Sequence, residues 1–195
     1  MTKSKSTYLA VLAVLMSPLV ANADVIITVN EVGGDVVFDV TGSLDLTGAT
    51  YLGGIGYADG FIGGGANWYI ASGAGGSVDN YAMTSFDGAF GTSTAFFSGP
   101  SSVFGNDFFI WGQGGATEQV GVQVGYSSGD AISSGMIFSG ATFASLSLLT
   151  GTYNYAIPND TITLLIGASS VPEPGTLALL GIGLFGMGLA RRKKV

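Results

Sequence analysis

Every cation of this chain lies close to one of its two ends. Residues 24–171 contain no Lys, Arg, His or Cys, and they carry twelve of the thirteen carboxylates. The basic side chains are Lys3, Lys5, Arg191, Arg192, Lys193 and Lys194. Side-chain salt bridges and disulfide bonds are therefore excluded within residues 24–171. The fold of this stretch must rest on apolar burial and backbone hydrogen bonds, with carboxylate repulsion eased by salt or divalent cations.

This charge pattern excludes several classes of function for the same residues. Nucleic-acid binding needs cations opposite phosphates, and binding to anionic lipid surfaces needs them too. The composition offers no histidine base, Schiff-base lysine, catalytic thiolate or His/Cys zinc site. Catalysis by carboxylates alone is the route that remains.

The glycine content favours strands joined by turns over helices. Residues 24–171 hold 28 of the 33 glycines, and each glycine in a helix interior costs about 1 kcal/mol relative to alanine. The 148 residues of this stretch suit one domain. We predict an all-β domain over residues 24–170, a sandwich or jelly roll of short antiparallel strands with Gly-rich turns.

Runs of β-branched or alternating residues predict the individual strands. Residues 24–30 and 35–41 form an expected hairpin around residues 31–34. The run 119–125 alternates strictly, which predicts that Val120, Val122 and Val124 share one face. Further strands are expected over 50–57, 67–71, 81–86, 107–111, 151–156 and 160–166, with a helical turn over 141–146.

The first 23 residues have the three parts of a secretory signal peptide. Lys3 and Lys5 precede an apolar stretch over 8–16, and Ala21-Asn22-Ala23 forms a small-x-small cleavage site before Asp24. We expect export through the Sec machinery and a mature chain that begins at Asp24. An N-terminal membrane anchor that stays attached is the alternative.

The last 25 residues also have three parts. Val171, Pro172, Glu173 and Pro174 precede an apolar run over 175–190, and the basic residues Arg191, Arg192, Lys193 and Lys194 follow it before Val195. The prolines prevent a helix from continuing back into the body. As a helix the run would span roughly 24 Å, slightly short of a ~30 Å hydrocarbon core. This pattern predicts a single transmembrane helix whose basic end stays in the cytoplasm.

These parts, in this order at the C-terminus, resemble the PEP-CTERM sorting domain of Gram-negative, exopolysaccharide-producing bacteria. The resemblance implies recognition by an exosortase, a membrane cysteine transpeptidase that cleaves near Pro172-Glu173-Pro174 and transfers the body to the cell surface or matrix. In that case the chain is the substrate of the enzyme. An ordinary tail anchor that follows a proline pair is the alternative.

The body resembles a group of uncharacterised PEP-CTERM proteins. The resemblance covers residues 34–37, 42–48, 142–146, 151–153 and 160–164. Those proteins usually carry Gly after the Phe-Ala-Ser-Leu step and Pro before the Gly-Thr-Tyr step, where this chain has Ser147 and Thr150. The resemblance implies a β-rich body whose turn at these residues differs, and it carries no activity.

Two groups of residues are candidates for binding. Asp35, Asp39 and Asp45 supply the hard oxygen ligands that Ca²⁺ takes, although their spacing does not compel a site. The aromatic residues Trp68, Tyr69, Phe108, Phe109 and Trp111 either stack on sugar rings or fill the core of a sandwich.

The leading hypothesis is therefore an exported protein without catalytic activity or a cofactor. We expect an inner-membrane-tethered intermediate, then a body delivered to the cell surface or an exopolysaccharide matrix, without binding to nucleic acid. One alternative is a carbohydrate-binding or calcium-dependent adhesive module. The other is a carboxylate-only glycan hydrolase, which requires two acids that face one cleft.

Overall fold

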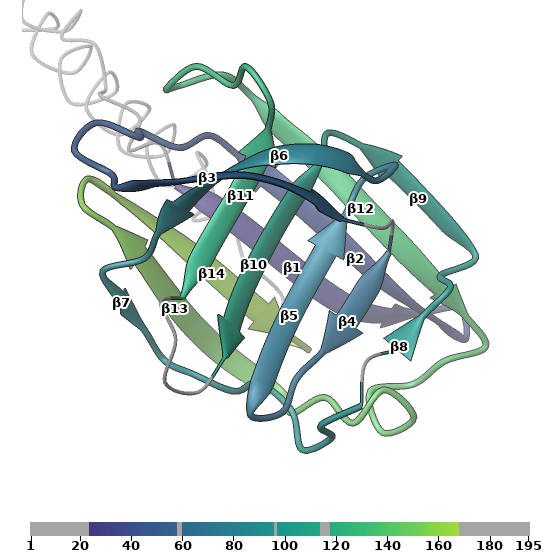
Figure 1. Ribbon diagram of the computed structural model, residues 1–195. Helices are drawn as coiled ribbons and strands as arrows, with labels where there is room; N and C mark the ends of the chain where they lie inside the picture. Colours follow the sequence, from purple (N-terminus) through teal and green to yellow (C-terminus); the bar gives the residue numbers. More distant parts are fainter. Residues whose placement is uncertain (1–23, 58–59, 96, 114–117, 168–195) are drawn as a thin grey trace, which may run out of the picture.

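The computed structural model describes residues 24–57, 60–95, 97–113 and 118–167, which form a sandwich of two seven-stranded sheets (Figure 1). The strands are β1 Val25–Val32, β2 Asp35–Gly42, β3 Tyr51–Tyr57, β4 Phe61–Gly63, β5 Asn67–Ser72, β6 Gly76–Ala82, β7 Ser85–Phe86, β8 Phe97–Ser98, β9 Ser102–Gly105, β10 Phe108–Gln113, β11 Gln119–Gln123, β12 Ile132–Ser139, β13 Gly151–Ile157 and β14 Asp160–Ile166. This confirms the all-β class. The expected signal peptide over 1–23 and the expected transmembrane helix over 175–190 lie outside the described residues.

Sheet A has the strand order β7-β13-β14-β1-β2-β12-β9, and sheet B has the order β3-β6-β11-β10-β5-β4-β8. All pairs are antiparallel except β1 and β14, which run parallel. The prediction of purely antiparallel strands is wrong for this pair. β1 and β14 are adjacent in the sheet but are the first and last strands in the sequence. No short turn joins them, so none forces them to run in opposite directions.

The predicted hairpin around residues 31–34 is confirmed. β1 and β2 pair from Val25 opposite Gly42 to Val32 opposite Asp35, which leaves a two-residue turn. Gly33 and Gly34 adopt φ angles of 64° and 93°. Turns with two residues of positive φ match the twist of the flanking strands, and glycine adopts such angles without steric cost.

The main core lies between the two sheets. Alternate residues of β1 and β14, such as Val25, Ile27, Leu164 and Ile166, are fully buried. Trp68 of sheet B lies with its ring centroid 4.8 Å from that of Tyr155 of sheet A, so the two layers meet at this aromatic pair. Burial raises the pKa of Tyr155 well above its ordinary value.

Two sequence-based expectations need correction, and one long strand was missed. The expected strand over 81–86 divides, because Met83 and Thr84 leave sheet B and the chain joins sheet A as β7. The alternating run ends at Gln123, so Val124 lies outside β11 and is exposed while Val120 and Val122 are buried. The strand β12 was not predicted, because Ser133, Ser134 and Gly135 interrupt its apolar pattern.

The expected helical turn is present as a single turn. Leu146 N–H donates to Thr142 O over 3.1 Å, and Thr142 and Ser145 donate their N–H groups to each other's hydroxyl oxygen. Ser147 then adopts a φ of 55°, in the left-handed region that favours glycine. Among the described residues, no helix reaches the length and apolar character needed to cross a membrane.

Candidate functional site

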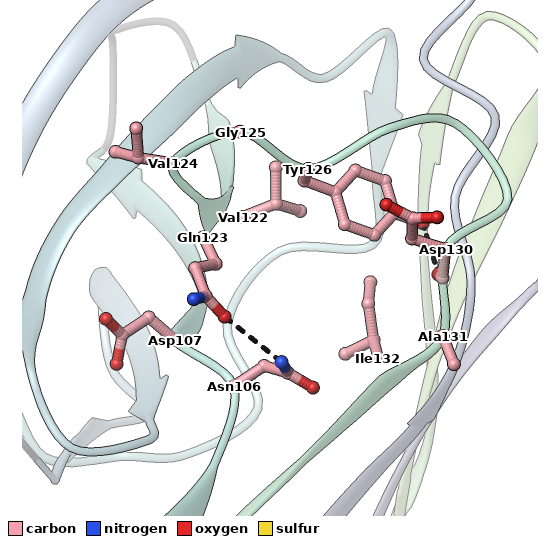
Figure 2. Close-up of a pocket in the computed structure, with 10 residues that line it drawn as sticks. All are labelled: Asn106, Asp107, Val122, Gln123, Val124, Gly125, Tyr126, Asp130, Ala131 and Ile132. Atoms are coloured by element: carbon pink, nitrogen blue, oxygen red, sulfur yellow. Dashed lines mark hydrogen bonds between the residues drawn. The ribbon is translucent and has the colours of Figure 1, made fainter.

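A pocket of about 250 Å³ lies at one end of the sandwich, beside the turns that flank β10, β11 and β12 (Figure 2). Its lining residues are Asn106, Asp107, Val122, Gln123, Val124, Gly125, Tyr126, Asp130, Ala131 and Ile132. Pockets for drug-sized ligands usually measure about 300–1,000 Å³. This pocket therefore suits only a small ligand.

Most polar groups of the pocket already have partners in the protein. Asn106 donates from Nδ2 to Gln123 Oε1 over 3.0 Å and accepts the N–H of Ser133 over 3.0 Å. Asp107 accepts the N–H of Gly75, and Asp130 accepts the N–H of Ser127. Figure 2 shows Asp107 and Asp130 at opposite ends of the lining. The two carboxylates therefore shape turns and do not form a close pair.

Tyr126 joins the pocket to a neighbouring loop. Its hydroxyl accepts the N–H of Leu44 over 2.7 Å and donates to Asp130 O over 2.8 Å. Burial raises the pKa of Tyr126, so the hydroxyl stays protonated at neutral pH. The residue holds the segment after β11 against the segment after β2.

The acidic residue Asp160 lies beside the loop that follows β2. Asp160 accepts the backbone N–H of Asp45 and that of Thr161. Burial raises the pKa of Asp160, and the neighbouring carboxyl of Asp24 adds to the rise while the two backbone bonds oppose it. Asp45 caps its own turn, and the hydroxyl and N–H of Thr47 lower its pKa. These acids organise the loop.

The three calcium candidates are not brought together. Asp35 accepts the N–H of Gly140 over 2.9 Å, and Asp39 lies exposed in β2 between Thr28 and Gly135. Asp45 lies in the loop after β2. Within the described ranges, no group of three or more carboxylates has the arrangement of a metal site.

The five candidate aromatic residues divide between two faces of sheet B. Trp68 and Phe108 belong to the core between the sheets. Tyr69, Phe109 and Trp111 form a separate cluster with Phe61, Ala71 and Val78 on the other side of the sheet. We call Phe61, Tyr69, Phe109 and Trp111 the outer aromatic face.

The strand register explains this division. Residues directly opposite each other in an antiparallel pair point to the same side of the sheet. Trp111 pairs with Tyr69, whereas Phe109 pairs with Ala71 and Gly121. The ring of Tyr69 lies 6.4 Å from that of Phe61 and 5.8 Å from that of Phe109. Burial raises the pKa of Tyr69 to about 12.

Comparison with protein families adds a finding for the C-terminus. Residues 170–194 match the family model of the PEP-CTERM protein-sorting motif. The chain carries a PEP-CTERM sorting tail. Such a tail marks a secreted protein for processing by an exosortase. Comparisons with curated proteins and with solved structures gave no match.

The match confirms the sequence interpretation of the PEP-CTERM tail. It includes Val171, Pro172, Glu173 and Pro174 and the basic residues 191–194. It leaves the resemblance of the body to other PEP-CTERM proteins as a prediction. The tail residues and the expected cleavage residues Ala21 and Ala23 lie outside the described part of the chain.

The sequence did not predict that Phe61, Asn80 and Gln119 lie on the outer side of sheet B. A partial signal existed for Gln119, because the alternation of 119–125 places it opposite the valine face. Asn80 follows no such pattern. Its side only becomes known from the pairing of β6 with β11.

Proposed function

We propose that this protein is a non-catalytic component of the cell surface or exopolysaccharide matrix of a Gram-negative bacterium. A signal peptide exports it through the Sec machinery, and its C-terminal apolar helix holds it at the inner membrane. An exosortase-like enzyme then processes it near Pro172-Glu173-Pro174. The match of residues 170–194 to the sorting motif is the observation that carries this proposal.

The distribution of charge supports the same route. All six cations lie in the two segments that export and sorting would remove. Positive charge on the cytoplasmic side of an apolar segment fixes its orientation. The delivered body therefore reaches the outside as a strongly anionic domain, which favours solubility and discourages binding to anionic lipid.

The hydrogen bonds that the carboxylates accept support the proposal that the body has no catalytic activity. Backbone N–H groups occupy one oxygen or more of Asp35, Asp87, Asp107, Asp130 and Asp160. A hydrolase of the carboxylate type needs two acids that converge on one bound sugar. The acids at the pocket lie at opposite ends of its lining (Figure 2), so the hydrolase alternative has weaker support.

Replacement of the sorting tripeptide tests the proposal. We expect the triple variant Pro172→Ala, Glu173→Ala and Pro174→Ala to accumulate as a longer, membrane-retained species in a host that contains an exosortase. Thr176→Ala is the matched control, because it changes the tail outside the tripeptide and should leave processing intact. Undiminished tail loss in the triple variant would refute the assignment.

A further inference from the structure

Sheet B ends at β3, and within the described residues this strand pairs on one side only, with β6. β3 is seven residues long, whereas the other three sheet edges are formed by β7 and β8, of two residues each, and by β9, of four. Figure 1 shows β3 as a long curved strand beside β6. Short edge strands limit pairing with another chain, whereas a long edge presents a row of free backbone N–H and C=O groups. β3 is therefore the edge most open to an added strand.

The side chains of β3 are exposed and uncharged. Tyr51, Leu52 and Ile55 are 55 %, 43 % and 41 % exposed. Residues 46–58 contain no charged side chain, so this edge lacks the charges that commonly keep strand edges apart. The pairing with β6 shifts between Tyr51 and Gly53, which makes Leu52 a bulge, and it is regular from Gly53 onward. A regular, apolar edge thus follows the bulge.

The sequence of β3 is complementary to itself in an antiparallel pair. A two-fold axis through Gly54 aligns two copies of the strand. Ile55 of one copy then lies opposite Gly53 of the other, on the same side of the joined sheet. In the same register, Leu52 comes next to Gly56. A Cβ built on Gly53 would meet nothing within 4 Å, and one on Gly56 would make only an ordinary contact at 3.7 Å. Each large apolar side chain finds open space over a glycine, which favours a second copy over an unrelated chain.

The charge of the body does not prevent this pairing at physiological salt. Residues 24–171 carry twelve carboxylates and no cation, so two bodies repel at long range. Asp79 is the acid that pairs with Gly54 beside the axis. Across two copies of β3, the two Asp79 backbones would lie three strand spacings apart, about 14 Å. This exceeds the Debye length of about 8 Å at 0.15 M salt, so the repulsion at this edge is largely screened.

We propose that β3 pairs with β3 of a second copy, antiparallel and centred on Gly54, so that two sandwiches join through one continuous sheet. Ile55 of each copy packs over Gly53 of the other, and the free backbone groups of the edge gain partners. Pairing through one strand buries little area, so the association is weak and depends on the local concentration of the protein. The inference goes beyond the proposed sorting and surface function. It needs only the folded body, so its failure would leave the sorting proposal unaffected.

Single-cysteine cross-linking of the full chain in detergent micelles tests the register, because the chain has no native cysteine. Directly opposite residues of an antiparallel pair have Cα atoms about 4.5–5.5 Å apart, within the range of about 4.4–6.8 Å that a disulfide needs. Gly54→Cys should therefore form a disulfide-linked dimer under mild oxidation. A Cβ on Gly54 makes only contacts of 3.7 Å or more, and its φ is not positive, so the strand can accept the substitution.

Gly56→Cys is the matched control on the same strand. In the proposed register, the two copies of this position lie four residues apart along the strands, roughly 14 Å. We expect its cross-linked yield, measured by non-reducing gel electrophoresis, to be lower than that of Gly54→Cys by about fivefold or more. Absence of a Gly54→Cys dimer would overturn the proposal. Equal yields from the two variants would also overturn it, because they would show chance collision or association elsewhere in the chain.

Ile55→Lys tests the same contact without cysteine. Lysine on an edge strand opposes strand addition, so we expect the dimer fraction, measured by sedimentation equilibrium in density-matched detergent, to fall by about fivefold or more. Phe104→Lys is the control, because Phe104 is also 41 % exposed, lies in the edge strand β9 of sheet A and receives the same charge. It should leave the dimer fraction unchanged. Equal effects of the two substitutions, or an unchanged dimer fraction in Ile55→Lys, contradict the proposal.

Salt gives a further readout of the occupant. Raising the NaCl concentration from about 10 mM to about 150 mM shortens the Debye length from about 30 Å to about 8 Å. Pairing between two acidic bodies predicts a larger dimer fraction at the higher concentration. A smaller dimer fraction would show attraction between opposite charges and would overturn the pairing of two β3 edges.

Discussion

The ring of Phe109 lies over the bare backbone of Gly121 on the neighbouring strand. A Cβ built on Gly121 would overlap ring atoms of Phe109, and the two residues are direct partners in the pairing of β10 with β11. Gly121 therefore makes room for the base of the outer aromatic face. The glycine is needed for space, since its φ is not positive.

Gly121→Ala tests this relationship. The added methyl group must displace the Phe109 ring, and we expect a loss of about 1–3 kcal/mol in the free energy of unfolding. Urea denaturation measures the change. Gly56→Ala is the control, because a Cβ on this strand glycine meets only Gly76 O, at 3.7 Å. Equal effects of the two substitutions would show that strand propensity, and not the ring, explains the result.

Ser147→Gly is expected to stabilise the body. Ser147 adopts a φ of 55°, and relief of that strain outweighs the greater freedom of glycine in the unfolded chain by about 0.5–1 kcal/mol. Ser145→Gly serves as the comparison, because Ser145 caps the same turn through its hydroxyl and should lose stability. Thermal unfolding of both variants decides the matter, and a lower Tm for Ser147→Gly would contradict the expected strain.

The stability of the body should depend on pH through Asp160. Burial raises the pKa of Asp160 above its ordinary value of 3.8. A group with a raised folded-state pKa contributes stability that is complete below the unfolded pKa and is lost as the pH rises through the folded pKa. Asp160→Asn should therefore gain stability relative to the wild type as the pH rises from 3 to 7.

Asp39→Asn is the control for this pH effect. It removes the same formal charge from an exposed position in β2, so it reports on general charge repulsion. Urea denaturation at each pH gives the difference between each variant and the wild type. Equal pH dependence in the two variants would assign the effect to overall charge instead of to Asp160.

Trypsin offers a simple test of the charge distribution. Residues 6–190 contain no Lys or Arg, so the body should stay uncut even in denaturant, while chymotrypsin should cut it at its many aromatic residues. Gel electrophoresis after digestion measures the outcome. Trypsin cleavage between residues 24 and 171 would mean that the protein differs from this sequence.

The fold class and the main hairpin could be predicted because they depend on local patterns. Glycine at residues 33–34 between two β-branched runs specifies a turn, and alternation specifies which valines of 119–125 are buried. The parallel pairing of β1 with β14 could not be predicted in this way. It joins residues more than a hundred positions apart, and nothing in either strand records its partner.

The outer aromatic face could not be predicted from the sequence for a related reason. Phe108, Phe109 and Trp111 follow one another closely in the sequence, and apolar residues at successive positions do not reveal which of them point to the core. Alternation places Phe108 and Phe109 on opposite sides of β10, but only the packing of the two sheets shows that Phe108 belongs to the core and Phe109 to the outer side. The unpaired oxygen of Asn80 is known only once β3, β6 and β11 lie side by side.

Intact mass spectrometry of the form recovered from the cell surface or medium tests the sorting account most directly. The account predicts a chain that begins at Asp24 and ends close to Pro172-Glu173-Pro174, so that none of the six Lys and Arg residues remains. Recovery of the protein with both Lys3 and Arg191 still in place would contradict it.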